Sequence, residues 1–215
     1  MHRYDPARQR LALGLAGLAG LVDATGFVVA GGYFTSFMSG NTTRLGVELA
    51  QRPVLALAPL GLIGCFLTGV IGGALLAPRL STKRREPVLL GLIAVTLGAG
   101  AGLLAAGQAI PFLVCSAMAM GLANNVFARD GEVTVGVTYM TGALVRFGQG
   151  VAARLGRREL ASARGYGWLW SALAMGAASG GALCLVTPRL AAGAGFVVAL
   201  ILWGAALLIA RRSED

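Results

Sequence analysis

Long apolar runs, separated by short polar stretches, dominate the pattern along this chain of 215 residues. A helix needs about 20 mostly apolar residues to cross the hydrocarbon core of a bilayer. Six runs come close to or exceed this length: Leu11–Tyr33, Val54–Ala77, Val88–Gly107, Ile110–Ala128, Gly165–Val186 and Gly193–Ala210. The pattern therefore predicts an all-α polytopic membrane protein with about six transmembrane helices and the lipid bilayer as its main partner.

Composition and charge support a membrane location. Charged residues make up 13% of the chain, whereas about 25% of a soluble domain is charged. The net charge of +9 comes from basic residues that cluster between the apolar runs. Because cytoplasmic loops of membrane proteins are rich in Lys and Arg, we interpret this charge as orientation and contact with anionic lipids at the cytoplasmic face. Nucleic acid is not an expected partner, since the chain lacks the polar surface and stacking aromatics that binding it requires.

The positions of the basic residues discriminate between topologies. With a cytoplasmic N-terminus and six crossings, both termini lie in the cytoplasm, and of the 18 basic residues only Arg44, Arg52 and Arg189 face outward. If the segments around Met38 and Met140 also crossed fully, the Lys83–Arg85 cluster would face outward as well. The positive-inside rule therefore favours six crossings.

An internal repeat is the most informative feature of the sequence. The first copy reads SFMSGNTTRLG at Ser36–Gly46, and the second reads TYMTGALVRFG at Thr138–Gly148. The similarity extends to GLVD and GLAN before the two copies, and to GGALLAPRL and GGALCLVTPRL after them. Glycines also recur at four-residue spacing, which lets helix backbones approach closely in lipid, at Gly69 and Gly73 and at Gly176 and Gly180. Three matches in the same order indicate a duplication.

Each repeat contains three crossings, so the second copy must be inverted relative to the first. Inverted repeats are a recurring architecture of secondary transporters. We expect one membrane domain made of a first repeat over residues 1–108 and a second over residues 109–215. The two motifs are too polar for lipid and too apolar for ordinary loops, so we expect each to form a re-entrant or half helix that reaches the bilayer midplane.

The motifs carry residues that suit an anionic ligand. Hydroxyl or amide side chains beside a glycine are typical of helix N-termini, where free N–H groups and the helix dipole bind anions. An arginine one turn further along each motif could clamp a carboxylate or phosphate. Alternatively, the polar residues only cap short helices, and the arginines bond backbone carbonyls or snorkel to lipid headgroups. The candidate binding residues are Ser39, Gly40, Asn41, Thr42 and Arg44 in the first motif and Thr141, Gly142 and Arg146 in the second.

Asp23 is the only acid within the six predicted spans. It could carry a proton or bind a cation coupled to transport, or it could neutralise Arg44 or Arg146, and we favour the salt bridge because a proton relay normally uses several titratable groups. Its counterpart in the repeat is Asn124, followed by Asn125, and all three join the candidate site. Glu48 is expected to lie at the interface or to pair with Arg44.

Signatures of catalysis are absent from the sequence. No cluster of His, Cys and acidic residues has metal-ligand spacing, and neither GxSxG nor GxxxxGK[ST] occurs. We therefore expect a protein that is not an enzyme, without catalytic residues, bound metal or cofactor.

Four segments together resemble the YoaK family of small bacterial membrane proteins. They are GLVDATGF at Gly20–Phe27, SFMSGNTTRLG at Ser36–Gly46, AMGLANNVF at Ala119–Phe127 and VTYMTGALVRFGQ at Val137–Gln149. The resemblance covers nearly the whole chain. It implies a bacterial inner membrane and the duplicated fold, and it implies no activity, because the family has no established one.

Three classes of function fit these observations. The first, which we favour, is a transporter or channel-like protein for a small anionic solute, with its site at the repeat interface near the midplane. The second is a membrane accessory or scaffold protein, which predicts a dry, packed centre. The third is an intramembrane enzyme acting on a lipid-linked substrate, with Asp23 as its acid or base. Gly-rich outer faces of a small bundle would also suit a homodimer.

Overall fold

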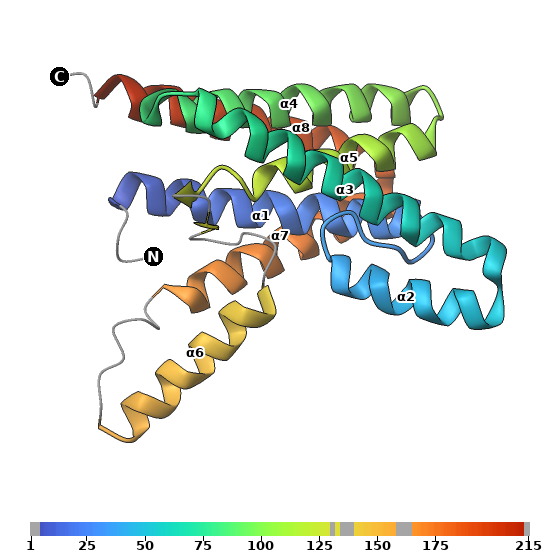
Figure 1. Cartoon of the computed structure of the whole chain (residues 1–215), viewed down its shortest axis with the longest axis horizontal. Helices are drawn as coiled ribbons and strands as arrows, with labels where there is room; N and C mark the ends of the chain where they lie inside the picture. Colours follow the sequence, from blue (N-terminus) through green and yellow to red (C-terminus); the bar gives the residue numbers. More distant parts are fainter. Residues whose placement is uncertain (1–4, 130–131, 134–139, 158–164, 213–215) are drawn as a thin grey trace.

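The computed structural model describes residues 5–129, 132–133, 140–157 and 165–212, which form eight α-helices (Figure 1). Two short 3-10 turns, η1 (Pro53–Ala56) and η2 (Ala77–Arg79), flank α3, and two-residue strands β1 (Ala128–Arg129) and β2 (Glu132–Val133) pair antiparallel. The predicted helical class is confirmed. The helices are α1 (Pro6–Val29), α2 (Met38–Gln51), α3 (Leu57–Leu76), α4 (Thr82–Ala105), α5 (Ala109–Ala123), α6 (Met140–Leu155), α7 (Tyr166–Val186) and α8 (Pro188–Arg212).

Five of the described helical segments are long and apolar enough to cross a membrane. They are α1, the continuous segment from Pro53 to Arg79 that contains α3, α4, α7 and α8. The sixth predicted span, Ile110–Ala128, is shorter than expected, because α5 has only 15 residues. At 1.5 Å per residue it extends about 22 Å, less than the hydrocarbon thickness of about 30 Å.

Two asparagines accompany the early end of α5. The Nδ2 group of Asn124 donates to the carbonyl oxygen of Met120 at 3.0 Å, and that of Asn125 donates to the carbonyl oxygen of Val70 at 3.1 Å. Side-chain amides that bond nearby backbone groups compete with helix continuation. Hydropathy therefore identified the segment as apolar but overestimated its helical length.

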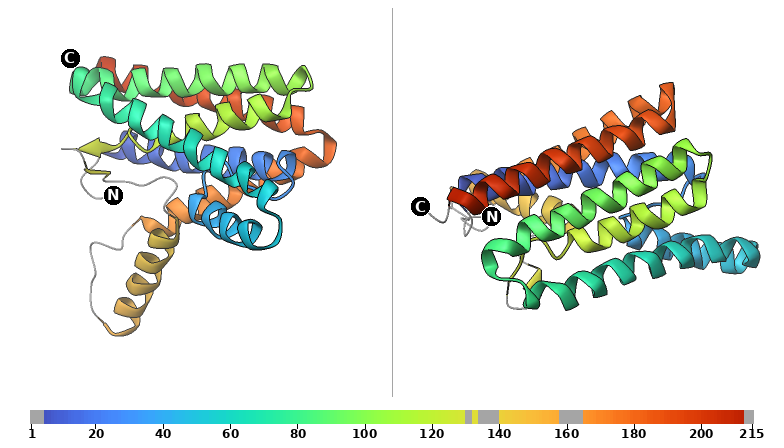
Figure 2. Two further views of the ribbon diagram at one scale, coloured as in Figure 1. Left: turned by 45° about the vertical axis from the view of Figure 1, so that its right-hand side comes forward. Right: turned by 90° about the horizontal axis from the view of Figure 1, so that it is seen from above.

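Helices that are distant in sequence pack side by side. The most extensive such contacts are α1 with α7, α3 with α5 and α4 with α8, and α1 also packs along α8, while the consecutive helices α4 and α5 pack together as well (Figures 1 and 2). The right-hand view of Figure 2 places α7 and α8 on one flank and α3 on the other. Fully buried side chains fill the space between these helices, among them Leu15, Leu18, Leu89, Ile93 and Met120.

Glycines bring the backbones of α1 and α7 into direct contact. A Cβ atom at Gly20 would fall on the carbonyl oxygen of Leu173, and one at Gly176 would fall on the carbonyl oxygen of Gly17. A Cβ atom at Gly180 would lie 2.6 Å from the carbonyl oxygen of Leu21. This crossing confirms the prediction that the spaced glycines of α7 serve close helix packing.

The α3–α5 crossing is built in the same way. A Cβ atom at Gly69 would fall on the carbonyl oxygen of Met118, and one at Gly121 would fall on that of Phe66. Gly73 instead faces side chains, since an added Cβ would lie 2.5 Å from Nδ2 of Asn125 and 2.9 Å from Cδ1 of Leu122. Gly69 therefore has the predicted role in close backbone packing, and Gly73 leaves space for the Asn125 amide.

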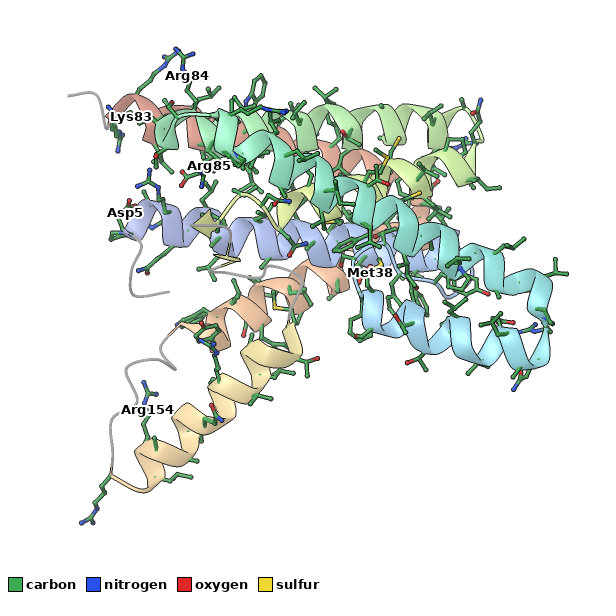
Figure 3. All side chains as sticks on the ribbon, viewed as in Figure 1. Asp5, Met38, Lys83, Arg84, Arg85 and Arg154 are labelled. Atoms are coloured by element: carbon green, nitrogen blue, oxygen red, sulfur yellow. The ribbon has the colours of Figure 1, made fainter. Side chains whose placement is uncertain are left out.

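Both described chain ends lie at one end of the bundle (Figure 1). Figure 3 shows Lys83, Arg84 and Arg85 at that same end, near Asp5. Helix α2 lies beside α3 toward the opposite end, whereas α6 packs on α7 and projects away from the bundle (Figure 1). The end that carries the termini therefore also carries the main basic connection.

Candidate functional site

The segment after α1 folds back along the helix that precedes it. The chain leaves α1 at Val29, yet the backbone N–H groups of Thr35 and Ser36 both donate to Oδ1 of Asp23, each at 2.8 Å. Asp23 lies six residues before the end of α1, which corresponds to about 9 Å along the helix axis. The chain thus returns toward the middle of the bundle before α2 begins, and Figure 3 places Met38 there.

Asp23 is therefore an anchor for this returning segment. Its Oδ1 atom also lies 3.3 Å from the Thr35 hydroxyl oxygen, and a Cβ atom at Gly26 would meet the Thr35 side chain. The expected salt bridge of Asp23 with Arg44 or Arg146 is wrong, because the ion pairs among the described residues join other side chains. A carboxylate that accepts two backbone N–H groups satisfies its charge without a cation.

Asn41 completes the anchor from α2. Its Oδ1 atom accepts from the Phe34 N–H at 2.9 Å, and its Nδ2 group donates to the Phe34 carbonyl oxygen at 2.7 Å. Asn41 is fully buried, so its amide supplies both partners that the Phe34 backbone would otherwise lack. This predicted ligand-binding residue has a structural role in the described state.

The remaining polar residues of the first motif do not cap α2 as expected. Helix α2 begins at Met38 with Phe37 as its N-cap residue, and Phe37 makes no side-chain capping bond. The Thr42 hydroxyl donates to the Met38 carbonyl oxygen at 2.9 Å, and Ser39 is exposed. A Cβ atom at Gly40 would fall on the Phe37 ring and lie 3.0 Å from the Phe34 ring. Aromatic rings thus lie against Gly40, where we expected a glycine open to a ligand.

Arg44, in the middle of α2, stacks on an aromatic ring. Its guanidinium carbon lies 5.6 Å from the centre of the Tyr33 ring, a cation–π distance. The preceding Gly32 has a φ of +111°, and an added Cβ there would lie 3.0 Å from an Arg44 nitrogen. Glycine at this position therefore leaves space for the guanidinium.

Glu48 bonds both Tyr33, on which Arg44 stacks, and a second arginine, Arg52. Its Oε1 atom accepts from Arg52 at 3.0 Å and from the Tyr33 hydroxyl at 3.3 Å. The expected pairing of Glu48 with Arg44 is wrong, because the partner at four-residue spacing is Arg52. The other oxygen of Glu48 is buried and has no hydrogen-bond partner in the described part of the chain.

Arg146 has an equivalent environment on α6. Its Nη1 group donates to the Tyr166 hydroxyl at 2.7 Å, and its guanidinium carbon lies 4.9 Å from the centre of that ring. Gly165, directly before this tyrosine, has a φ of +89°. Thr141 and Gly142 are exposed at the start of α6, and residues 138 and 139 of the second motif lie outside the described residues.

The structure does not bring the two arginines to one point. Arg44 and Arg146 stack on different tyrosines, and their helices α2 and α6 point away from each other (Figure 1). Asn124 and Asn125 are buried at the end of α5, where their amides bond backbone carbonyls. Sequence reasoning missed Tyr33 and Tyr166, although a Gly-Tyr pair precedes or follows each motif and would have been a usable signal.

A small void lies among α1, α4, α5 and α8. Its volume is about 10 Å³, enough for at most one water molecule, and Thr25 and Ser116 line it together with apolar side chains. The Ser116 hydroxyl is buried and has no hydrogen-bond partner among the described residues. The described residues also contain no group of three or more His, Cys, Asp and Glu side chains that could hold a metal ion.

Comparison with known proteins identifies relatives without an assigned activity. The family described as "Protein of unknown function (DUF1275)" matches residues 11–208. The chain is 36% identical to a protein of Rhizobium meliloti (strain 1021) named "UPF0700 transmembrane protein RA0705", over 97% of this chain and 92% of the relative. No solved structure matches.

Proposed function

We propose that this chain, which belongs to the DUF1275 family of membrane proteins, moves a small anionic solute across the membrane as a transporter or channel-like protein. The family description assigns no function, so the proposal depends on the residues themselves. The observation that carries it is the pair of arginine–tyrosine stacks, Arg44 on Tyr33 and Arg146 on Tyr166.

These stacks suit the capture of an anion. A guanidinium is always charged and presents donors in a planar fork that matches a carboxylate or phosphate. Arg44 makes no hydrogen bond with its guanidinium among the described residues, and the Tyr33 ring holds that guanidinium in place. Each arginine lies on a short helix, and the two helices extend toward opposite ends of the molecule (Figure 1). We propose that the arginines receive the solute on the two sides of the membrane, with the other candidate site residues supporting them.

Transport by alternating access would use two inverted repeats that move relative to each other. We propose that residues 1–108 and 109–215 form two such repeats, joined between α4 and α5, with α2 and α6 as their re-entrant helices and α5 as a short sixth crossing. The glycine contacts support this arrangement. Gly20 of α1 contacts the Leu173 carbonyl of α7, and Gly121 of α5 makes the corresponding contact with the Phe66 carbonyl of α3. Each contact therefore joins a helix of one half to a helix of the other. The UPF-type label of the relative is compatible with the YoaK resemblance.

We further propose a bacterial inner membrane and cytoplasmic termini. The support is the basic connection at the end of the bundle that holds both chain ends (Figure 3). Ser81→Cys and Gln51→Cys, each made in a background without the three natural cysteines, test it. A membrane-impermeant maleimide added to intact cells should label the cysteine at position 51 and leave the one at position 81 unlabelled. Labelling of position 81 alone would reverse the orientation.

A binding screen on the detergent-purified protein tests the anion proposal first. Chloride, nitrate, sulfate, phosphate, acetate and succinate are the probes, and the melting temperature is the readout. At least one anion should stabilise the parent, and Arg44→Gln and Arg146→Gln should each lose that stabilisation. Arg189→Gln and Arg154→Gln are the matched controls, because neither arginine stacks on a tyrosine of the described residues, and they should respond like the parent.

Equal behaviour of all four variants would overturn the assignment of the two arginines. Anions that stabilise should then be tested for flux in proteoliposomes, where the two stack variants should be slower. Loss of stability in Arg44→Gln and Arg146→Gln without any anion effect would favour the second candidate function, a membrane accessory protein. The void lined by Thr25 and Ser116, about 10 Å³ in volume, favours that candidate, because it has no room for a solute.

A further inference from the structure

A groove opens between the N-terminal part of α1 and the C-terminal part of α8. Its volume is about 450 Å³, within the range of small-molecule sites. It lies at the end of the bundle that carries both chain ends (Figure 1). Its apolar lining includes Leu11 of α1 and Leu202, Ala205 and Leu208 of α8. Its charged lining includes Arg10, near the start of α1, and Arg212, at the end of α8.

Of the charged residues that line this groove, Arg10 and Arg212 are available to bind a ligand. Asp5 also lines it, but its carboxylate is engaged by Arg8, which donates from its backbone N–H at 2.8 Å and from Nη1 at 3.0 Å. Arg8 itself also pairs with Glu86 at 2.8 Å and does not line the groove. Arg10 and Arg212 are exposed, and neither makes a side-chain hydrogen bond or ion pair within the described part of the chain.

We propose that this groove binds an anionic phospholipid of the membrane leaflet on that side. Arg10 and Arg212 hold the phosphate from two helices, since guanidinium groups match phosphate oxygens bidentately. An acyl chain lies along Leu202 and Leu208 of α8, of which Leu208 is 59% exposed. A lipid fits better than a free phosphate, because the apolar wall continues into the lipid-facing surface of a spanning helix. The inference does not depend on the proposed transport function.

Short-chain lipids added to the detergent-purified full chain test this site. The probes are dihexanoyl phosphatidylglycerol, dihexanoyl phosphatidylethanolamine, glycerol 3-phosphate and inorganic phosphate, and the readout is the concentration that gives half of the maximal rise in melting temperature. Phosphatidylglycerol should act at a concentration at least about fivefold lower than phosphatidylethanolamine. Any stabilisation by the two phosphates without acyl chains should be unchanged in Arg10→Gln and Arg212→Gln, because these anions lack the chain that fills the groove.

Variants separate the groove from general charge attraction. Arg10→Gln and Arg212→Gln should each raise the half-stabilising concentration of phosphatidylglycerol about fivefold, the value expected for one cation near an anionic lipid. Arg211→Gln is the matched control, because Arg211 neighbours Arg212 on α8 without lining the groove. Leu208→Asn should weaken both lipids alike, and its exposed position keeps the fold intact.

Three results would overturn the proposal. They are equal stabilisation by the two lipids, an equal shift for Arg211→Gln and Arg212→Gln, and an unchanged response in Leu208→Asn. If all groove variants keep the anion-dependent rise in melting temperature that Arg44 and Arg146 provide, the lipid groove and the arginine–tyrosine stacks are independent sites.

Discussion

Replacing Gly176 by alanine tests the contact between α1 and α7 most directly. An added Cβ would fall on the carbonyl oxygen of Gly17 and lie 2.7 Å from its carbonyl carbon. Ordinary contact begins near 3.4 Å, so α7 would have to withdraw by at least about 0.7 Å in a tightly packed interior. No rotamer change relieves this clash, because both partners are backbone atoms.

The expected loss follows from two opposing effects. Alanine is the better helix former by about 1 kcal/mol, whereas overpacking of a filled interior costs about 1–3 kcal/mol, and separation of the helices also loses close van der Waals contacts. We expect Gly176→Ala to lower the free energy of unfolding by about 1–2 kcal/mol. Gly181→Ala, on the same helix with nothing within 4 Å of the added Cβ, should be neutral or slightly stabilising.

The same comparison on α3 examines the proposed symmetry. Gly69→Ala would place its Cβ on the carbonyl oxygen of Met118, whereas Gly72→Ala meets open space. Unfolding in mixed micelles of increasing SDS content, followed by tryptophan fluorescence, measures all four variants. If Gly176→Ala is as stable as Gly181→Ala, the backbone contact is absent in the membrane protein. If only one of Gly69→Ala and Gly176→Ala destabilises, the two crossings are not equivalent.

Three further predictions concern polar contacts. Asn41→Leu strips the buried Phe34 N–H and carbonyl of their partners and should lower the free energy of unfolding by about 2–5 kcal/mol, measured by the same SDS titration. The backbone and side-chain hydrogen bonds from Arg8 lower the pKa of Asp5 below its ordinary value of 3.8. The stability that this carboxylate contributes is therefore present above pH 3.8 and is lost as the pH falls further. Melting temperatures measured from neutral pH to about pH 3 should show this loss in the parent and not in Asp5→Asn. Arg8→Gln leaves the mostly buried Glu86 carboxylate without its cation and should reduce stability by about 1–3 kcal/mol, whereas the double change with Glu86→Gln should recover part of that loss.

Several aspects of the fold were predictable because they follow from local properties of the sequence. In lipid, a backbone must satisfy its hydrogen bonds internally, so a long apolar run becomes a helix whatever its neighbours are. The spans starting near Leu11, Val54 and Val88 follow from this rule, and so does the role of the spaced glycines at Gly69 and Gly176. The sixth span was overestimated because the amides that accompany the end of α5 are not visible in hydropathy.

The candidate site depended on contacts that hydropathy does not encode. Asp23 bonds backbone groups twelve and thirteen residues later, and Arg146 stacks on a tyrosine twenty residues away. The GGAL motif aligns Gly72 with Gly180, yet an added Cβ at Gly180 would meet the Leu21 backbone, whereas one at Gly72 would meet nothing within 4 Å. A polar side chain accepts any partner of suitable geometry, so only the path of the chain decides which one it meets.

By itself, the sequence therefore determined the membrane class, most of the spans, the distribution of charge and the small residues at helix crossings, because each depends on about one helix length of chain. The tertiary structure alone decided that Asp23 anchors a returning segment, that Arg44 and Arg146 lie apart on two tyrosines, and that Arg10 and Arg212 line one groove. Each of these relations joins side chains or backbone groups from different segments of the chain, so its geometry arises only when those segments pack against one another.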